Sequence, residues 1–236
     1  MKIALIGYGK MGKAIEEIAL QRKHEIVLKI NRDNLQELSN ISKADVAIEF
    51  TNPNSAYQNV KKTIELNIPV VCGTTGWLEK YDEIKKLVAE KNGAFIYASN
   101  FSVGVNIFFE LNKKLAVLMS SHSDYEAIIE ETHHTQKKDA PSGTAITLAE
   151  QILEANKKKK RWVNEVSDNP EDLEIISQRI DPTPGTHSVK YSSAIDDIEI
   201  IHTAHSRKGF ALGAVVAAEF LKDKKGIFTM KDVLSL

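Results

Sequence analysis

The side chains best suited to acid–base chemistry gather between residues 131 and 144. His133 and His134 are adjacent, and Lys137 and Lys138 follow shortly after them. Histidine titrates near neutral pH, so it can give or take a proton during a reaction. Taken singly, each residue has an ordinary explanation, because histidines are common at strand ends and paired lysines are typical of a solvated turn. Together they form a candidate catalytic group.

The end of the same segment predicts a pocket for an anion. Ser142 follows Pro141 and precedes apolar residues at helical spacing, so we expect it to be the N-cap of a helix. The free backbone N–H groups in the first turn of a helix can bind an anion. A small polyanionic substrate would fit between the histidines and Ser142, Gly143 and Thr144.

A second candidate site lies near the N-terminus, where a predicted strand at residues 2–6 leads into a glycine-rich turn and a helical pattern. Strand, G-x-G-x-x-G and helix in this order are typical of dinucleotide binding. Gly7 would make the tight turn, Gly9 would let the backbone approach a pyrophosphate, and Gly12 would let helix and strand pack closely. A glycine-rich turn without a ligand is the alternative. The residues expected to bind the cofactor here are Gly7, Tyr8, Gly9, Lys10, Met11 and Gly12.

The end of the second predicted strand, residues 25–30, bears on the choice of cofactor. Domains that bind NAD commonly have an acid here for the ribose 2′-hydroxyl. This chain has Asn31 and Arg32 at the strand end, and an arginine pairs with a 2′-phosphate that an acid would repel. We expect both NADH and NADPH to be used, with NADPH at least as good. The alternative is that Arg32 points into water.

The predicted strands divide the chain into two parts. Strands that begin near residues 2, 25, 45, 69 and 94 alternate with helical segments or turns, which favours an α/β fold with a Rossmann-type, doubly wound parallel sheet. A long helix is expected from about residue 103 to 119. Fewer helices separate the strands expected near 125–134, 174–180, 188–194 and 197–205, which indicates a second α+β domain with a mixed or antiparallel open sheet.

Composition narrows the class of protein. A net charge of −1 on 236 residues gives no basic field that would favour nucleic acid as a partner. The single cysteine, Cys72, is expected to be a small buried residue of a reduced, cytoplasmic protein. The chain begins with a predicted strand and has no long apolar run, so we expect neither secretion nor contact with a membrane. The charge run at 157–161 is interpreted as a solvated helix end.

The segment Glu131-Thr-His-His-Thr-Gln-Lys-Lys-Asp-Ala-Pro-Ser-Gly-Thr144 resembles the E-x-H-H-x-x-K-x-D-A-P-S-G-T signature of the bacterial dihydrodipicolinate reductases. These enzymes are also called 4-hydroxy-tetrahydrodipicolinate reductases and act in the lysine and diaminopimelate pathway. Similar motifs lie at 73–76, 99–104, 202–211 and 226–234. Together with the N-terminal strand and glycine-rich turn, they extend the resemblance from residue 3 to residue 234.

The resemblance implies an NAD(P)H-dependent reduction of a cyclic imine dicarboxylate to tetrahydrodipicolinate. His133 would be the proton donor, Lys137 would assist it, and His134 with residues 142–144 would bind the substrate. No metal is expected. Further cofactor contacts are implied at Gly73, Thr74, Thr75, Ala98, Ser99, Asn100 and Phe101.

The resemblance also implies a discontinuous arrangement of domains. Residues 1–101 with 207–236 would bind the dinucleotide, and residues 102–206 would bind substrate and form a homotetramer through their sheet. The chain is shorter than many members, and the region 157–187 is where loops could be trimmed, so its loops are the least defined part of the expectation. Residues 181–187 are expected to be a turn-rich loop.

Two other functions fit parts of the sequence. A dinucleotide-sensing regulator would share the first domain, but it should carry a basic DNA-binding element, and none is visible. Another Rossmann-type imine or semialdehyde reductase is the second alternative. A semialdehyde dehydrogenase would need a nucleophilic cysteine, and Cys72 on a buried strand fits that role poorly.

Overall fold

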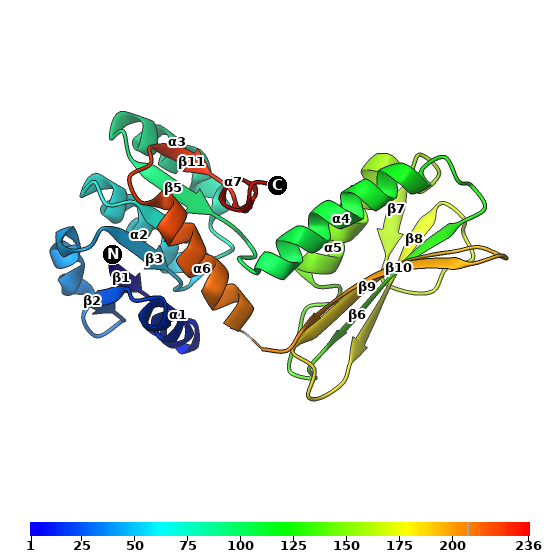
Figure 1. The fold of residues 1–236 in the computed structure, drawn as a ribbon, viewed down its shortest axis with the longest axis horizontal. Coiled ribbons are helices and arrows are strands. Elements are labelled where there is room, and N and C mark those ends of the chain that lie inside the picture. Colours follow the sequence, from blue (N-terminus) through cyan, green and yellow to red (C-terminus); the bar gives the residue numbers. More distant parts are fainter. Residues whose placement is uncertain (207) are drawn as a thin grey trace. The chain divides into compact units, whose positions relative to one another are not determined.

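The computed structural model describes residues 1–206 and 208–236 and divides into two compact units (Figure 1). The first unit comprises Met1–Val103 and Lys208–Leu236, and the second comprises Gly104–Arg207. The domain boundaries expected after residues 101 and 206 lie within two residues of these. Arg207, which we placed at the start of the returning segment and within the motif at 202–211, lies outside the described residues.

The first unit is a parallel sheet with helices between its strands (Figure 1). Its order is β11-β5-β4-β3-β1-β2, and all neighbouring strands run parallel, as the sequence predicted. Its elements are β1 (Lys2–Ile6), α1 (Lys10–Gln21), β2 (Glu25–Ile30), a 3-10 helix (Leu35–Lys43), β3 (Val46–Glu49), α2 (Pro53–Glu65), β4 (Val70–Cys72), a second 3-10 helix (Leu78–Lys80), α3 (Tyr81–Glu90), β5 (Ala94–Tyr97), α6 (Lys208–Leu221), β11 (Gly226–Phe228) and α7 (Met230–Leu234). The short edge strand β11 was not among the predicted strands.

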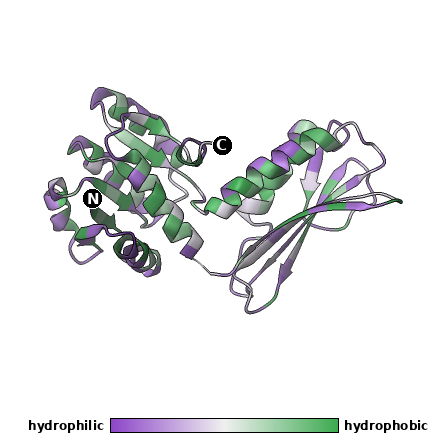
Figure 2. Ribbon diagram, viewed as in Figure 1, coloured by the Kyte–Doolittle hydropathy of each residue, from purple (hydrophilic) through white to green (hydrophobic). Residues whose placement is uncertain are grey.

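The core of the first unit explains why its strands are almost uniformly apolar. Alternate residues face opposite sides of the sheet, and helices cover both sides. Ile3 and Leu5 of β1 pack with α1 and α6, whereas Ala4 and Ile6 pack with α2 and α3. The strands and the helix faces that cover them are accordingly rich in hydrophobic residues (Figure 2).

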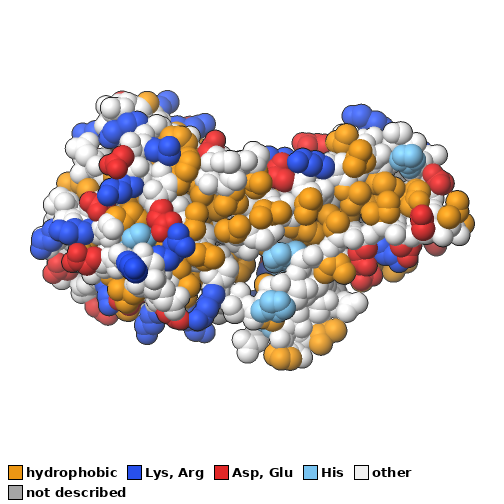
Figure 3. Space-filling view, viewed as in Figure 1, with side chains coloured by type: hydrophobic (Ala, Val, Ile, Leu, Met, Phe, Trp, Pro, Cys, Tyr) orange, Lys and Arg blue, Asp and Glu red, His pale blue; other side chains and the backbone are white. Residues whose placement is uncertain are grey.

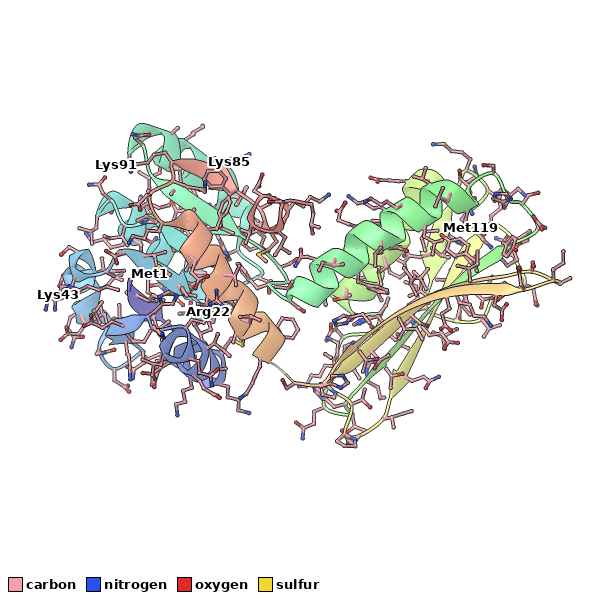
Figure 4. The ribbon with its side chains drawn as sticks, viewed as in Figure 1. Met1, Arg22, Lys43, Lys85, Lys91 and Met119 are labelled. Atoms are coloured by element: carbon pink, nitrogen blue, oxygen red, sulfur yellow. The ribbon has the colours of Figure 1, made fainter. Side chains whose placement is uncertain are left out.

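The returning helix α6 packs closely on this sheet. A side chain at Gly213 would place its Cβ 1.6 Å from the carbonyl oxygen of Phe101, so the helix can approach only because this position has no side chain. At the edge of the contact, Glu219 accepts from Arg22 at 2.8 and 2.7 Å, and Arg22 lies at the end of α1 beside α6 (Figure 4). Residues almost two hundred positions apart therefore close the first unit.

The second unit has a mixed five-stranded sheet of order β10-β9-β6-β8-β7. The pairs β6–β9 and β9–β10 are antiparallel, whereas β6–β8 and β7–β8 are parallel. Two helices pack on one face of the sheet, where Phe108, Leu148, Ile129 and Val189 share a core. Its elements are α4 (Val103–Met119), β6 (Glu126–His133), α5 (Gly143–Ala155), β7 (Arg161–Val163), β8 (Asp172–Arg179), β9 (Gly185–Ser192) and β10 (Asp197–Ala204).

Two predictions in the region 157–187 were wrong. The lysine run lies after the helix and is not part of it, because α5 ends at Ala155. The run is solvated as predicted except at Lys159, which is only 8% exposed and has its ammonium 2.8 Å from Glu126. The segment 181–187 is not wholly a loop, because β9 begins at Gly185 and includes His187.

The surface is mixed in charge. On the face shown in Figure 3, lysine and arginine side chains are interspersed with aspartate and glutamate over the first unit. Among the described residues, no helix combines the length and the apolar character needed to cross a membrane.

Candidate active site

A buried polar cluster lies at the C-terminal end of β6 in the second unit. Glu131 and His133 are two residues apart on this strand, so their side chains share one face. His187 of β9 lies directly opposite Glu131 in the antiparallel register. Ser142, which precedes α5, is also buried and contacts the same group. Each of these four residues is at most 8% exposed.

Glu131 is held at the centre of this cluster as a carboxylate. The backbone N–H of Ser142 donates to both of its oxygens at 3.1 Å. The hydroxyl of Ser177 donates to Oε1 at 2.8 Å, and the guanidinium of Arg179 lies 3.3 Å from the same oxygen. Burial by itself would raise the pKa of this carboxyl group, but the hydrogen bonds from His133, His187, Ser142 and Ser177 hold its pKa well below the usual range.

The two imidazoles face each other beside this carboxylate. Their Nε2 atoms are 3.3 Å apart, and their rings meet edge to face with centroids 5.0 Å apart. Burial lowers the pKa of His187, so this ring is neutral at pH 7. Its Nδ1 is buried and has no hydrogen-bond partner among the described residues, which favours the tautomer with hydrogen on Nε2, because an unpaired acceptor costs less than an unpaired donor.

Gly185 makes room for the ring of His133. A Cβ at this position would lie 2.9 Å from Cε1 and 3.1 Å from Nδ1 of His133. No role was predicted from the sequence for Gly185, Glu131, Ser177, Arg179 or His187. The alternation of β6 could have revealed Glu131, since it lies two residues before His133 on the same face.

His134 and Lys137 lie in the segment after the strand. Because β6 ends at His133, His134 turns away from the buried cluster and lines a pocket with Gln136 and residues 181–184. The backbone N–H of Lys137 donates to the carbonyl of His134 at 3.1 Å, which forms a turn. The ammonium of Lys137 lies 2.9 and 2.8 Å from the two oxygens of Asp139 and lowers the pKa of that carboxyl group.

The start of α5 confirms the predicted N-cap. The hydroxyl of Ser142 accepts from the backbone N–H of Ala145 at 3.2 Å. The predicted anion pocket has one donor fewer than expected. The N–H of Ser142 already donates to Glu131, so it cannot also bind a substrate carboxylate. Gly143 and Thr144 remain at the helix start, and a Cβ at Gly143 would meet none of the other described residues within 4 Å.

The glycine-rich turn lines a pocket in the first unit. Gly7, Tyr8 and Gly9 lie on one side of it, and Asn31 and Arg32 lie on another. The predicted cofactor-binding residues Lys10, Met11 and Gly12 form the first turn of α1 instead of this wall. Sequence reasoning missed the wall after β3, which consists of Phe50, Thr51, Asn52, Ser55 and Asn59. The turn residues at 51–55 were the available signal.

The three glycines have the geometry that the motif predicts. Gly7 has a φ of +99°, and a Cβ there would lie 1.9 Å from the carbonyl oxygen of Phe50. A Cβ at Gly12 would lie 2.3 Å from the carbonyl oxygen of Gly7, so helix and turn touch. In the part of the chain that the structure describes, a Cβ at Gly9 would have no neighbour within 4 Å, which leaves the backbone open to a ligand.

The remaining predicted cofactor contacts follow β4 and β5. Thr74 is buried, and its hydroxyl accepts from the backbone N–H of Thr51 at 2.7 Å. Phe101 is also buried, and its ring centroid is 5.7 Å from that of Phe50, so both residues brace the wall of the pocket. Gly73, Thr75, Ala98, Ser99 and Asn100 lie in the same two connections, outside the lining of this pocket.

Models of the dihydrodipicolinate reductase family match both parts of the chain. The N-terminal model covers residues 1–101, and the C-terminal model covers residues 104–234. The chain is 57% identical to the 4-hydroxy-tetrahydrodipicolinate reductase of Christiangramia forsetii over all of this chain and 98% of that protein. It is 35% identical to the protein of that name in Methanocaldococcus jannaschii, over 98% of this chain and 81% of the relative.

Solved structures share the fold at lower identity. The dipicolinate-bound dihydrodipicolinate reductase of Paenisporosarcina sp. TG-14 superposes with a TM-score of 0.78 at 22% identity, over 97% of each chain. A probable dehydrogenase from Thermotoga maritima gives a TM-score of 0.61 at 10% identity, over 99% of this chain and 92% of the other. Together with the family models and the relatives, these likenesses assign the chain: it belongs to the dihydrodipicolinate reductase family, whose members are oxidoreductases that use a pyridine nucleotide.

Proposed function

We propose that this protein reduces 4-hydroxy-tetrahydrodipicolinate to tetrahydrodipicolinate with NADPH or NADH, in the biosynthesis of diaminopimelate and lysine. The observation that carries this proposal is the 57% identity, over the whole chain, to a reductase of that name. The dipicolinate bound to the Paenisporosarcina enzyme supports a cyclic dicarboxylate as the substrate class.

The first unit would bind the dinucleotide in the pocket beside the glycine-rich turn. The open backbone at Gly9 and the N-terminus of α1 favour a pyrophosphate there. When bound, the reduced nicotinamide supplies the hydride.

The balance of charge at the end of β2 supports use of both cofactors. Arg32 would pair with a 2′-phosphate, and Asp33, which lines the same pocket, would accept from the free 2′-hydroxyl of NADH. We propose that NADPH is used at least as well as NADH.

His133 would supply the proton. Hydride delivered to a conjugated imine leaves electron density on the ring, which a general acid must quench. Glu131, with its Oε2 3.5 Å from Nε2 of His133, would stabilise the protonated imidazole and fix its orientation. Lys137 would steady developing negative charge or take part in proton transfer once substrate draws its ammonium away from Asp139.

The start of α5 and His134 would hold the substrate. The N–H groups of Gly143 and Thr144, with the hydroxyl of Thr144, suit a carboxylate at a helix N-terminus. The hydroxyl of Ser142 faces His187 and would support the site from behind. His134, which lines a neighbouring pocket, would contact the substrate from the other end of the segment.

A coupled assay tests the function. A dihydrodipicolinate synthase, fed with pyruvate and aspartate semialdehyde, would generate the substrate in the presence of NADPH and this protein. We expect the absorbance of the reduced cofactor to fall only when synthase, both precursors and this protein are all present. A protein that binds NADPH in a fluorescence titration but oxidises none in this assay would instead be a dinucleotide-binding protein without this activity. Oxidation of NADPH with aspartate semialdehyde alone would indicate a semialdehyde reductase, which reduces the aldehyde to an alcohol.

A further inference from the structure

Three side chains of the buried cluster hold their polar atoms in a nearly equilateral triangle. Nε2 of His133 and Nε2 of His187 are 3.3 Å apart. Oε2 of Glu131 lies 3.5 Å from the first and 3.6 Å from the second. All three residues are buried on the paired strands β6 and β9, so their positions are set by the sheet.

These separations are those of long hydrogen bonds, and they are also short enough for three ligands of one ion. Hydrogen bonds of this kind have donor–acceptor distances of about 2.7–3.2 Å, and all three separations exceed that range. A point equidistant from the three atoms lies roughly 2.0 Å from each. Bonds from zinc to imidazole nitrogen and carboxylate oxygen are about 2.0–2.2 Å.

The carboxylate of Glu131 is also held in a position suited to binding a metal ion. Its Oε1 accepts from Ser177 and Arg179, which leaves Oε2 for the two imidazoles and the shared N–H of Ser142. Carboxylates that bind metals are usually held by a second hydrogen-bonded layer of this kind. The hydroxyl of Ser142 lies 3.1 Å from Nε2 of His187, beside one corner of the triangle. Zinc sites with three protein ligands take a water as the fourth ligand.

We propose that Glu131, His133 and His187 form a binding site for a divalent transition-metal ion of the zinc class. Two imidazoles with one carboxylate suit zinc and cobalt, whereas magnesium prefers oxygen ligands and bound water. The guanidinium of Arg179 would weaken the site by repulsion, but it bonds the oxygen that does not face the triangle.

Occupation of this site would inhibit the reductase, an effect that rests on the proposed function of His133. The metal would take the lone pair of Nε2 of His133, so this nitrogen could not carry a proton while the ion is bound. His187 would bind the metal as the other tautomer, so its hydrogen would move from Nε2 to Nδ1. Zinc would thus be an inhibitor and not a cofactor, and removal of metal with a chelator should leave activity intact or raise it.

Calorimetry on the full-length protein, stripped of metal with a chelator and dialysed, tests the site without reference to activity. We expect one zinc per chain in the wild type and no binding of magnesium. His187→Gln, which removes one corner of the triangle, should weaken zinc binding at least tenfold. His122→Gln is the matched control, because His122 is an exposed histidine of the same unit and should bind zinc like the wild type.

Cobalt gives a second readout that does not depend on any variant folding. Wild-type protein with one equivalent of cobalt should show the visible absorption bands of a four-coordinate ion with nitrogen and oxygen ligands. Absence of stoichiometric zinc binding by the wild type, or equal zinc affinity in wild type and folded His187→Gln, would overturn the proposal. Zinc binding by a protein that is inactive in the coupled assay would overturn the proposed function alone.

Discussion

At the scale of single residues, Glu131 is the charge on which the buried cluster depends. It is about 1% exposed and accepts hydrogen bonds from a backbone N–H, a hydroxyl and a guanidinium. Removing one partner of a buried charged pair leaves the other uncompensated, which typically costs about 3–5 kcal/mol. Loss of this carboxylate should therefore lower the free energy of unfolding by more than the loss of its packing contacts alone would.

We predict that Glu131→Ala lowers the free energy of unfolding by about 3–5 kcal/mol at pH 7. The neighbouring Glu130 is exposed, so Glu130→Ala should change it by no more than about 0.5 kcal/mol. Urea denaturation followed by circular dichroism measures both. Equal stability of the two variants would contradict the role of Glu131.

The same carboxylate predicts how stability depends on pH. Its pKa in the folded protein lies below its usual value, so its ionised form stabilises the fold at pH values above the unfolded pKa of about 4.3. This stabilisation is lost as pH falls below that value, and the difference between wild type and Glu131→Ala should shrink there.

Arg32 sets the expected preference between the cofactors. A hydrogen-bonded contact between guanidinium and phosphate contributes about 1.5–3 kcal/mol, so Arg32→Ala should lower kcat/KM for NADPH by roughly tenfold to a hundredfold. NADH lacks the phosphate, and its kcat/KM should stay within about twofold of the wild type. Lys43→Ala removes an exposed charge from the same unit but outside the pocket, and it should affect neither cofactor (Figure 4). Equal losses of kcat/KM with both cofactors in Arg32→Ala would contradict the assignment of Arg32 as the partner of the 2′-phosphate.

At the scale of elements, alanine substitutions at two glycines of α6 distinguish the effect of helix propensity from the effect of packing. A Cβ at Gly213 would lie 1.6 Å from the carbonyl oxygen of Phe101, whereas among the described residues a Cβ at Gly209 would meet only the Ser102 hydroxyl at 3.5 Å. Alanine favours the helix over glycine by up to about 1 kcal/mol at either position. A steric clash makes alanine unfavourable only at Gly213, where the helix touches the backbone of Phe101.

Gly213→Ala should therefore destabilise the protein by about 1–3 kcal/mol or more, and Gly209→Ala should be neutral or stabilising. Thermal and urea unfolding of the two variants would show the difference directly. If both substitutions were stabilising, the close approach of α6 to Phe101 would be disproved.

The element scale also shows what the sequence could and could not predict. The strands β1 to β5 and the helix α4 were predictable because each is a local pattern with turn residues at its ends. The three-residue strands β7 and β11 were missed, since so short a run has no periodicity to detect. His187 was missed because its partner His133 lies 54 residues away, and only the register of β6 with β9 brings the rings together.

The wall of the nucleotide pocket after β3 was missed for a similar reason. The motif at 7–12 is local, but the residues at 50–59 reach the pocket only because β3 pairs with β1 in parallel. Conversely, the hydrogen bond from Ser142 to Glu131 could not be foreseen, and it removes one predicted ligand from the anion pocket.

At the scale of the whole molecule, the second unit leaves isoleucines exposed on its last strand. Ile201 is 59% exposed and Ile198 is 39% exposed, both on β10, while Ile195 in the preceding turn is 86% exposed. We propose that the open face of this sheet forms the interface of a homotetramer. Ile201 points to this open face, because its neighbour Ile200 packs into the core on the other face, and an exposed apolar side chain there favours association with another copy.

Light scattering after size-exclusion chromatography tests this assembly. We predict a mass four times the 26.3 kDa of the chain. Ile201→Glu, on the sheet, should shift the mass toward smaller species, whereas Ile195→Glu, in the turn, should leave it unchanged. A monomeric wild type would rule out the tetramer.

The central claim is that this reductase takes its proton from His133, and the kcat of His133→Gln measured beside the wild type in the coupled assay tests it most directly. Removing a general acid typically lowers the rate by about 10²–10⁴-fold. We predict a loss of that order for kcat, with NADPH affinity unchanged in a fluorescence titration because the dinucleotide pocket lies in the other unit. A His133→Gln enzyme within threefold of the wild-type kcat would show that another group supplies the proton.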